Sequence, residues 1–430
     1  MSQSASEWLA SGLAPMASAL EGTQNLAIAE QVRSLVAAGK TVCTLTIGDF
    51  EPAHYPLPKQ LLEGTAQAMR DGWTNYPPST GIAELRTAVL GLCERRRGWR
   101  PALESVLVAG GARPVLYACY LALLDRGDKV VFATPSWNNN HYAHMVGARA
   151  VELPVGPEDN FFPDFAHIRP HLGDARLIVL NSPLNPSGTC IDRGALLQLC
   201  QAIVAENERR KAAQQRPLFL CYDQIYWMLT FGQTRHVDPV GVLPAMADYT
   251  IYVDGISKCF AATGLRVGWT VAPPPVADAM NKLLGHIGAW APKAEQRAAA
   301  ELLRDDVAID SYLTFIRAAA GERLTLLHAR LTALAERGYP IRALVPQGAI
   351  YLSAEFALVG WRDGGRVLAD ADQVRAWLLG EVGIATVPFA VFGAQHAEHW
   401  HRLSVGAVGV QELGDALDRL EVALGRLQPA

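Results

Sequence analysis

The sequence predicts an α/β protein with a large domain and a smaller companion domain. Between about residues 103 and 272, short apolar runs alternate with longer amphipathic runs, which is the pattern of βαβ units. The 430 residues also exceed the usual size of one hydrophobic core. We therefore expect a large domain with a mostly parallel seven-stranded sheet flanked by helices, and a smaller α+β domain formed by both ends of the chain.

Seven apolar runs are the expected strands, and several are nearly continuous in leucine and β-branched residues, as buried strands are. They cover residues 105–109, 129–133, 148–153, 176–181, 217–222, 250–254 and 268–272. Helices are expected after Arg113, Asn138, Asp192 and Pro274. The helix that follows Asp192 should end in the charged segment 206–211, which we expect to face solvent.

The two ends of the chain are predicted to form the smaller domain. An amphipathic helix is expected at 26–38, a long helical region from about Ala291 to Arg337, and an α+β segment at 339–427. These elements place the large domain at 55–310 and the small domain at 1–54 and 311–430. Since no Pro/Ser-rich linker separates the parts, the two lobes should pack closely around a shared cleft.

Composition excludes several classes of protein. Half of the residues are hydrophobic and 19 % are charged, as in a globular enzyme, and 38 basic against 42 acidic residues give a net charge of −4. Nucleic acid is therefore not an expected partner. The basic run Arg95-Arg96-Arg97 precedes Gly98, so we expect it in the solvent-exposed last turn of a helix.

Cysteine spacing and the N-terminus indicate a cytoplasmic protein without a metal site. The seven cysteines form no CxxC pair and no His-Cys spacing suited to zinc, so reduced thiols are expected. Residues 1–15 lack a basic start followed by an apolar run, and no apolar stretch is long enough to span a membrane. We therefore expect neither export nor a membrane partner.

One lysine carries the strongest chemical signal. Lys258 follows Ser257, and Arg266 comes eight residues later in a glycine-containing loop. A lysine amine attacks a carbonyl when its surroundings lower its pKa, and a hydroxyl with an arginine can hold a phosphate. The segment suggests a phosphorylated aldehyde cofactor, although from these residues alone a lysine in an ordinary loop is the favoured interpretation.

Other polar or glycine-rich segments follow the predicted strands. Residues 108–114 combine glycines with Pro114 at a strand-to-helix junction, which suits either a phosphate-binding helix N-terminus or a tight turn. Residues 181–188 form a rigid loop with two asparagines and two prolines. Asp223 ends another strand, and Tyr226 comes three residues later. The carboxyl ends of parallel strands face the ligand crevice in open α/β sheets.

Together these motifs resemble the class I aminotransferases, pyridoxal-phosphate enzymes of fold type I. The resemblance spans nearly the whole chain, and its most specific parts are Asn185-Pro186-x-Gly188, Asp223-x-x-Tyr226, Ser257-Lys258 with Arg266, and Arg402-Leu403-Ser404, in this order. It implies that the protein moves an amino group from an L-amino acid to a 2-oxo acid by a ping-pong mechanism.

The resemblance also implies a role for each matching residue. Lys258 would form the Schiff base with pyridoxal phosphate and shuttle a proton, Asp223 would pair with the ring nitrogen, and Tyr226 with Asn185 would bond the phenolic oxygen. Trp137 would stack on the ring. The cofactor phosphate would be bound by Ser257, Arg266 and the backbone around Gly111, Ala112 and Arg113.

Further residues would bind substrate or reach a second subunit. Arg402 would clamp the substrate α-carboxylate, and the backbone of Gly48 would lie beside it. Tyr76 resembles a tyrosine that reaches the neighbouring subunit's phosphate, which implies a homodimer. Arg113 falls where some bacterial aspartate aminotransferases of this family have a lysine for a second carboxylate. A dicarboxylate substrate is therefore a hypothesis, and a solvated Arg113 side chain is the alternative.

Departures from the family pattern leave the catalytic groups in place. Gln224, Ser187 and Asn138 replace an acidic residue, a threonine and a proline that are common there. Two other functions stay open. One is a lyase that carries out β-elimination with the same cofactor, and the other is a non-catalytic sensor of that cofactor. A nicotinamide dehydrogenase is disfavoured because no strand is followed by G-x-G-x-x-G.

Overall fold

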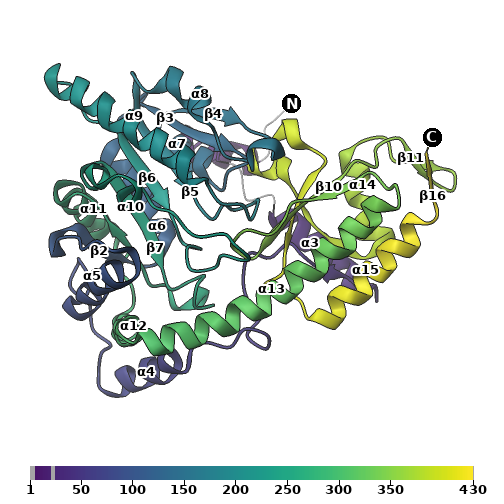
Figure 1. Ribbon diagram of the computed structural model, residues 1–430, viewed down its shortest axis with the longest axis horizontal. Helices are drawn as coiled ribbons and strands as arrows, with labels where there is room; N and C mark the ends of the chain where they lie inside the picture. The colour runs from purple at the N-terminus through teal and green to yellow at the C-terminus, as the bar shows by residue number, and fades with distance from the viewer. Residues whose placement is uncertain (1–4, 21–24, 430) are drawn as a thin grey trace.

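The computed structural model describes residues 5–20 and 25–429 and has two lobes (Figure 1). The large lobe contains a seven-stranded sheet in the order β2-β8-β7-β6-β5-β3-β4. Its strands are β2 Val106–Ala109, β3 Lys129–Thr134, β4 Arg149–Pro154, β5 Ala175–Asn181, β6 Phe219–Asp223, β7 Thr250–Gly255 and β8 Gly268–Val271. Only β8 runs antiparallel to its neighbours β2 and β7 among these strands, so the expected mostly parallel sheet is confirmed.

Both faces of this sheet are buried because successive residues of each strand point to opposite sides. Val131, Ile178 and Leu220 pack into the larger core, whereas Val130 and Leu177 pack into a second core on the other face. Helices therefore cover the sheet on both sides. Those of the large lobe are α4 Lys59–Arg70, α5 Ala83–Arg97, α6 Ala112–Leu123, α7 Asn139–Val146, α8 Phe165–Ile168, α9 Arg193–Ala212, α10 Pro239–Val242, α11 Pro274–Ile287 and α12 Lys293–Arg304.

Both ends of the chain build the smaller lobe. Strand β1 (Cys43–Thr44) pairs in parallel with β13 (Ile384–Ala385). An antiparallel sheet in the order β14-β15-β10-β9 and a three-stranded sheet in the order β12-β11-β16 complete it. Their strands are β9 Ile341–Ala343, β10 Tyr351–Phe356, β11 Trp361–Asp363, β12 Arg366–Val367, β14 Val387–Pro388, β15 Trp400–Ser404 and β16 Leu427–Pro429. The smaller α+β domain formed by both termini is therefore confirmed.

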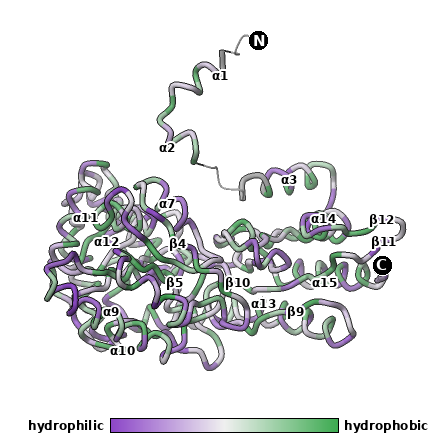
Figure 2. Tube along the Cα trace, turned by 90° about the horizontal axis from the view of Figure 1, so that it is seen from above, coloured by the Kyte–Doolittle hydropathy of each residue, from purple (hydrophilic) through white to green (hydrophobic). Residues whose placement is uncertain are grey.

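Helices α3 (Asn25–Ala37), α14 (Ala371–Trp377) and α15 (Val410–Leu424) also belong to the smaller lobe (Figure 1). Two short N-terminal helices, α1 (Ala5–Ala10) and α2 (Pro15–Ser18), lie outside both lobes in Figure 2. The ring nitrogen Nε2 of His144 in α7 lies 2.9 Å from the carbonyl oxygen of Met16 in α2. The part of the chain that the structure describes contains no helix long and apolar enough to cross a membrane.

The long helix α13 (Asp306–Glu336) connects the two lobes (Figure 1). The helical region expected from about Ala291 to Arg337 is present, but the chain breaks at Asp305 and divides it into α12 and α13. That residue has an extended backbone, and its carboxylate accepts a hydrogen bond from the backbone N–H of Ala308 at 3.0 Å. Asp305 therefore ends α12 and caps α13.

Two charged segments expected to face solvent are partly buried instead. Arg97, at the end of α5, has a side chain that is only 4 % exposed and pairs with Asp238. In α9, Arg210 is buried and donates hydrogen bonds to the carbonyl oxygens of Leu172 and Ala175, both at 2.7 Å. The helix ends were predicted well, but partners from distant segments decide which charged side chains leave water.

Candidate active site

A cavity of about 700 Å³ lies where the two lobes meet. Residues of the large sheet's carboxyl edge and of the small lobe line it together. They are Thr46, Ile47, Gly48, Asp49, Ala112, Arg113, Leu116, Trp137, Asn181, Asn185, Asp223, Ile225, Tyr226, Ser257, Lys258, Thr263, Gly264, Arg266, Tyr351 and Arg402. Most of the residues expected from the sequence to form a site are therefore brought together in one place.

Lys258 lies in the cavity just after strand β7. Its Nζ donates a hydrogen bond to the carbonyl oxygen of Gly48 at 2.5 Å. Burial lowers the pKa of Lys258 to about 8, and the positive charges of Arg402, Arg113 and other arginines act in the same direction, while Asp49 opposes them. A substantial fraction of this amine is therefore uncharged and nucleophilic near neutral pH.

Asp223 is the last residue of β6, and its carboxyl group lines the same cavity. Burial raises the pKa of Asp223 to about 7, although a hydrogen bond from the backbone N–H of Ile225 to Oδ1 at 3.0 Å and the charge of Lys258 act in the opposite direction. The side-chain amide of Asn181 donates to the Asp223 carbonyl oxygen at 2.9 Å and fixes the strand end. The site can thus offer a carboxylate to a cationic partner.

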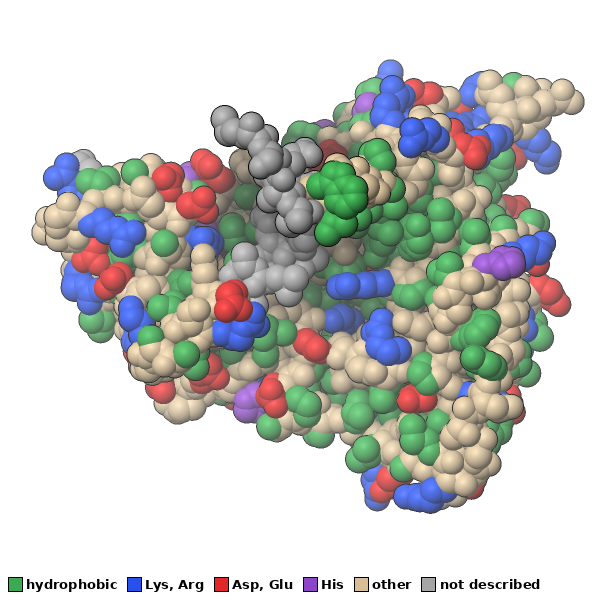
Figure 3. All heavy atoms as spheres, turned by 180° about the vertical axis from the view of Figure 1, so that it is seen from behind, with side chains coloured by type: hydrophobic (Ala, Val, Ile, Leu, Met, Phe, Trp, Pro, Cys, Tyr) green, Lys and Arg blue, Asp and Glu red, His purple; other side chains and the backbone are tan. Residues whose placement is uncertain are grey.

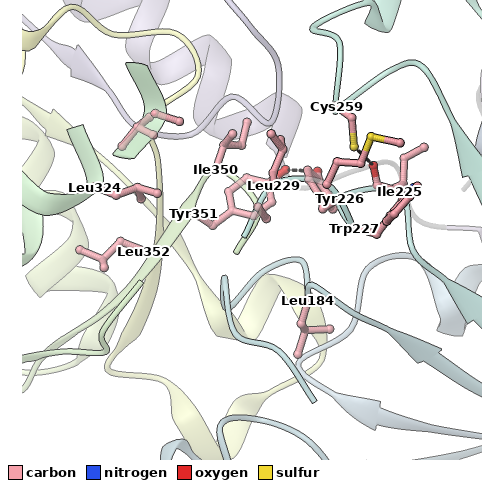
Figure 4. Packing of buried hydrophobic residues seen from close by; sticks show 14 of the residues in the cluster. Leu184, Ile225, Tyr226, Trp227, Leu229, Cys259, Leu324, Ile350, Tyr351 and Leu352 are labelled. Carbon is pink, nitrogen blue, oxygen red and sulfur yellow. Dashed lines mark hydrogen bonds between the residues drawn. The ribbon is translucent and has the colours of Figure 1, made fainter. Parts of the chain in front are cut away.

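Two tyrosines meet hydroxyl to hydroxyl at the wall of the cavity (Figure 4). The Oη atoms of Tyr226 and Tyr351 are 2.6 Å apart, and their rings pack edge to face with centroids 5.6 Å apart. Tyr351 begins β10 of the small lobe, whereas Tyr226 belongs to the large lobe. This contact therefore joins the lobes at the site.

Arg402, in strand β15, is buried with its guanidinium toward the cavity. Its Nη1 donates to Oδ1 of Asn185 at 3.0 Å, and its Nη2 donates to the carbonyl oxygen of Thr46 at 2.6 Å. The guanidinium lies 4.7 Å from the ring centroid of Tyr351. Among the described residues, the buried Nε of Arg402 has no hydrogen-bond partner. A carboxylate in the cavity would satisfy the remaining donors.

The opposite end of the cavity is a narrow turn around Arg266. Gly111 caps helix α6 with φ of 100°, and an added Cβ there would collide with the Arg266 guanidinium. A Cβ on Gly268 would lie 2.7 Å from the backbone nitrogen of Ala112. Arg266 itself donates to the carbonyl oxygens of Thr263 at 2.8 Å and Gly110 at 3.1 Å. The two glycines therefore leave room for the Arg266 guanidinium beside the N-terminus of α6.

The structure corrects one detail of this turn. We expected the helix to begin after Arg113 with Pro114 at its first position, but α6 begins at Ala112. Gly111, whose φ is positive, precedes the helix, which therefore starts two residues earlier than expected. Pro114 still falls in the first turn, where its missing N–H costs nothing.

Arg113 and Trp137 lie together at the cavity. The Arg113 guanidinium stacks over the Trp137 ring, 4.5 Å from its centroid, and the arginine is otherwise exposed. Tyr76 lies outside the lining of the cavity, with 83 % of its surface exposed and its ring packed edge-on against Trp290. Gly111 supports the cavity from behind and is likewise not part of the lining.

Sequence reasoning assigned no role to three polar side chains of the lining, which are those of Thr263, Asp49 and Tyr351. Thr263 donates its hydroxyl to Oδ1 of Asp49 at 2.6 Å, which links the two lobes across the cavity mouth. Asp49 lies in the segment next to Gly48, but no motif marked its carboxylate. Tyr351 begins the strand Tyr351–Phe356, whose sequence carries no motif that would have marked this residue.

The family profile described as aminotransferase class I and II matches residues 40–420. The chain belongs to this family. Among its relatives, the aspartate/prephenate aminotransferase of Thermus thermophilus is 30 % identical over 96 % of this chain and 99 % of its own length. The aspartate aminotransferase of Pyrococcus horikoshii is 28 % identical over 90 % of this chain and 92 % of its own.

Solved structures agree with this assignment. The aspartate aminotransferase of Thermus thermophilus with maleate matches this aminotransferase with a TM-score of 0.84 and 27 % identity, covering 96 % of this chain and 99 % of that one. The two-lobed architecture expected from the sequence is thus the architecture of known aminotransferases. The motifs that the sequence places after its strands are those that line the cavity.

Proposed function

We propose that this aminotransferase uses pyridoxal phosphate to move an amino group from an L-amino acid to a 2-oxo acid. One observation carries the proposal: Lys258, Asp223 and Arg402, from three separate segments, open into the same cavity. An amine of lowered pKa, a carboxyl group and a buried guanidinium are the groups that this chemistry requires. The lyase and sensor alternatives have no comparable support from a specific contact.

The residues around the cavity fit this cofactor. Its phosphate would lie at the N-terminus of α6, where Gly111 and Gly268 leave no Cβ beside Arg266 and Ala112. Ser257 and Arg266 would add donors at the same end. Asp223 would pair with the protonated ring nitrogen, Trp137 would cover the ring, and Asn185 with Tyr226 would donate to the phenolic oxygen.

Pyridoxal phosphate supplies an aldehyde for the amino group and a ring that withdraws electrons from the substrate α-carbon. The protein must then control one proton. With its pKa near 8, Nζ of Lys258 would take the proton from the α-carbon and return it on the cofactor side. A positive ring nitrogen beside Asp223 would keep that carboxyl group ionised.

Arg402 would orient the donor through its α-carboxylate. The guanidinium is already held by Asn185 and by the Thr46 carbonyl oxygen, so little conformational entropy is lost when substrate binds. A carboxylate beside Nε would also give that buried group an acceptor. The backbone of Gly48 lies beside Tyr351 and next to this position, with no room for a Cβ.

As a second part of the proposal, Arg113 would bind the second carboxylate of a dicarboxylate substrate. Arg113 lines the same cavity as Arg402, its side chain is exposed, and its guanidinium stacks on the Trp137 ring. The related Thermus thermophilus enzyme was solved with maleate, which carries two carboxylates. Replacing Arg113 with alanine should therefore raise KM for aspartate or glutamate more than KM for alanine. Equal effects on all three would contradict this part.

We also propose a homodimer in the cytoplasm. Exposed Tyr76 would reach the phosphate end of the neighbouring subunit's cavity, as the family resemblance implies. The seven cysteines are buried, and none forms a disulfide in the described chain, which suits a reducing compartment. Light scattering of the purified protein, followed by measurement of cofactor affinity in a Tyr76→Phe variant, tests the dimer and the role of Tyr76.

The central proposal is tested by trapping the lysine. Borohydride reduction of the purified holoenzyme should leave the cofactor attached to the peptide that contains Lys258, and Lys258→Ala should lose the attachment. Adding single amino acids to the holoenzyme without a 2-oxo acid should then bleach the cofactor absorbance and release one oxo acid per site. Release of ammonia and pyruvate instead would point to the lyase.

A further inference from the structure

A second cavity, of about 400 Å³, lies behind the loop that follows Tyr226. It shares no lining residue with the active-site cavity. Its lining is rich in arginine and includes Arg96, Arg97, Arg193, Arg235 and Arg317, together with the imidazole of His236. We propose that this arginine cavity binds a small multivalent anion, and that the bound anion acts on the adjacent active site.

Charges in the arginine cavity are only partly neutralised. Arg96 forms ion pairs with Asp306 at 2.8 Å and Asp310 at 2.6 Å. Arg97 pairs with Asp238 at 2.8 Å, which is the sole carboxylate among the residues that line the cavity. These pairs account for two of the five guanidinium groups.

The other three arginines have no carboxylate within 4 Å among residues 5–20 and 25–429. Arg235 donates to the carbonyl oxygens of Gly232 and Thr234, and Arg317 donates through Nε to that of Met228 at 2.7 Å. Burial lowers the pKa of Arg317, the nearby Cys259 and Asp310 act in the opposite direction, and the charges of Arg235 and Arg96 lower it further. With Arg193, three exposed arginines therefore gather in the cavity without a direct ion pair among the described residues.

Buried nitrogen atoms without hydrogen-bond partners also favour an anion site in this cavity. The Arg97 side chain lies between the rings of Trp99 and Tyr252, 4.7 and 4.2 Å from their centroids, and its buried Nε has no hydrogen-bond partner in the described chain. Both ring nitrogens of His236 are buried, and neither has a partner among the residues described. Burial lowers the pKa of His236 to about 3, so its ring is neutral and carries one N–H. An oxyanion in the cavity would give that N–H and the Nε–H of Arg97 the acceptors that they lack.

The chemistry of the lining defines the ligand class. Guanidinium groups bind phosphate and carboxylate oxygens through paired N–H donors, and three of them suit a ligand with at least two negative charges. A cavity of this volume holds a small molecule. Figure 3 shows acidic and basic side chains mixed over the face seen from behind. The ligand is therefore a phosphate ester, a pyrophosphate or a polycarboxylate.

A bound anion would contact the segment that carries the catalytic groups. Trp227 and Met228 line the arginine cavity and directly follow Tyr226. The Trp227 indole N–H donates to Oδ2 of Asp254 at 2.9 Å, and the Gln224 side-chain amide donates to the same oxygen at 3.3 Å. Gln224 directly follows Asp223 in the chain. A displacement of Trp227 would therefore shift the segment that positions Asp223 and Tyr226.

Direct binding to the holoenzyme tests the proposal, because the active-site phosphate position is then filled. We would titrate it with pyrophosphate, inorganic phosphate or citrate by calorimetry at constant ionic strength, with chloride as the balancing anion. The double variant Arg235→Gln/Arg317→Gln should bind the preferred anion about ten-fold more weakly or worse. Arg366→Gln is the matched control, since Arg366 is exposed and has no carboxylate within 4 Å among the described residues, and it should bind like wild type.

The outcomes are distinct. A preference for pyrophosphate and phosphate assigns a phosphorylated ligand, and a preference for citrate assigns a polycarboxylate. Lack of saturable binding by the wild-type holoenzyme would overturn the site, whatever the variants do, and so would equal affinity in the wild type and a folded double variant. If the double variant does not fold, Arg193→Gln takes its place. Binding that leaves both kcat and KM unchanged would remove the coupling to the active site.

Discussion

The hydroxyl groups of Tyr226 and Tyr351 lie 2.6 Å apart and join the two lobes at the wall of the cavity. Tyr351→Phe removes one of these hydroxyls and leaves the ring in place, so the buried Tyr226 hydroxyl loses its partner. We expect about 1 kcal/mol of lost stability and a moderate decrease in kcat, because Tyr226 would be less firmly oriented. Urea unfolding and steady-state kinetics measure both, and an unchanged kcat would show that Tyr226 needs no such support.

The charge of Asp49 should set the pKa of Lys258. Burial and the nearby arginines lower that pKa to about 8, whereas Asp49 raises it. Asp49→Asn should therefore shift the Lys258 pKa downward and move the pH dependence of cofactor attachment to the apoenzyme toward lower pH. The rate of attachment would be followed by absorbance across pH. Asp71→Asn, at the exposed end of α4, serves as the control and should leave the profile unchanged.

Asp223 should make the apoenzyme less stable as pH rises. Its pKa is raised to about 7 in the folded chain, so the folded state holds a proton that the unfolded state releases between about pH 4 and 7. The associated stability is full at acid pH and is lost as pH rises through 7. Asp223→Asn should therefore raise the apoenzyme Tm more at pH 8 than at pH 5 while abolishing activity. A Tm gain that is equal at both pH values would contradict the assigned pKa.

Arg402→Lys should separate charge from geometry at the substrate carboxylate. Lysine keeps the positive charge but cannot bond Asn185, the Thr46 carbonyl oxygen and a carboxylate through one planar group. We expect kcat/KM for amino donors to fall by about two orders of magnitude, mostly through KM, with cofactor affinity unchanged. A variant with normal KM would move the carboxylate site away from Arg402.

Gly111→Ala should weaken cofactor binding through two effects. The added methyl group would collide with Arg266, and φ of 100° is unfavourable for alanine. Gly173→Ala is a suitable control because nothing lies within 4 Å of the added Cβ and its backbone does not need glycine. Cofactor dissociation, measured by dialysis and absorbance, should be faster in Gly111→Ala alone. Equal dissociation from both variants would argue against a phosphate position beside Arg266.

Local sequence predicted the parts of the site that directly follow strands. Lys258, Asp223 and Asn185 could be located because an apolar strand followed by a polar residue has a defined edge in a parallel sheet. Tyr351 and Thr263 could not, because their contacts depend on how one lobe packs against the other. No periodic pattern encodes that packing.

The burial of charged side chains was the second feature that the sequence did not predict. The run Arg95-Arg96-Arg97 has the composition of an exposed helix end, and α5 does end there with Gly98 in the left-handed conformation. Arg97 is nevertheless buried. Its guanidinium lies between the rings of Trp99 and Tyr252 and forms an ion pair with Asp238, which is more than a hundred residues later in the chain. A charged residue can be buried only with its partner, and the partner is not visible in the local sequence.

The parallel pairing of Cys43–Thr44 with Ile384–Ala385 also constrains biosynthesis. During translation the N-terminal strand must wait for a partner that leaves the ribosome near the end of synthesis, while the strands of the large sheet are all present much earlier. The nascent chain would therefore hold a folded catalytic sheet with an unfinished carboxylate-binding lobe. Truncation near the C-terminus should leave a collapsed but inactive chain, exposed to proteases at its first fifty residues.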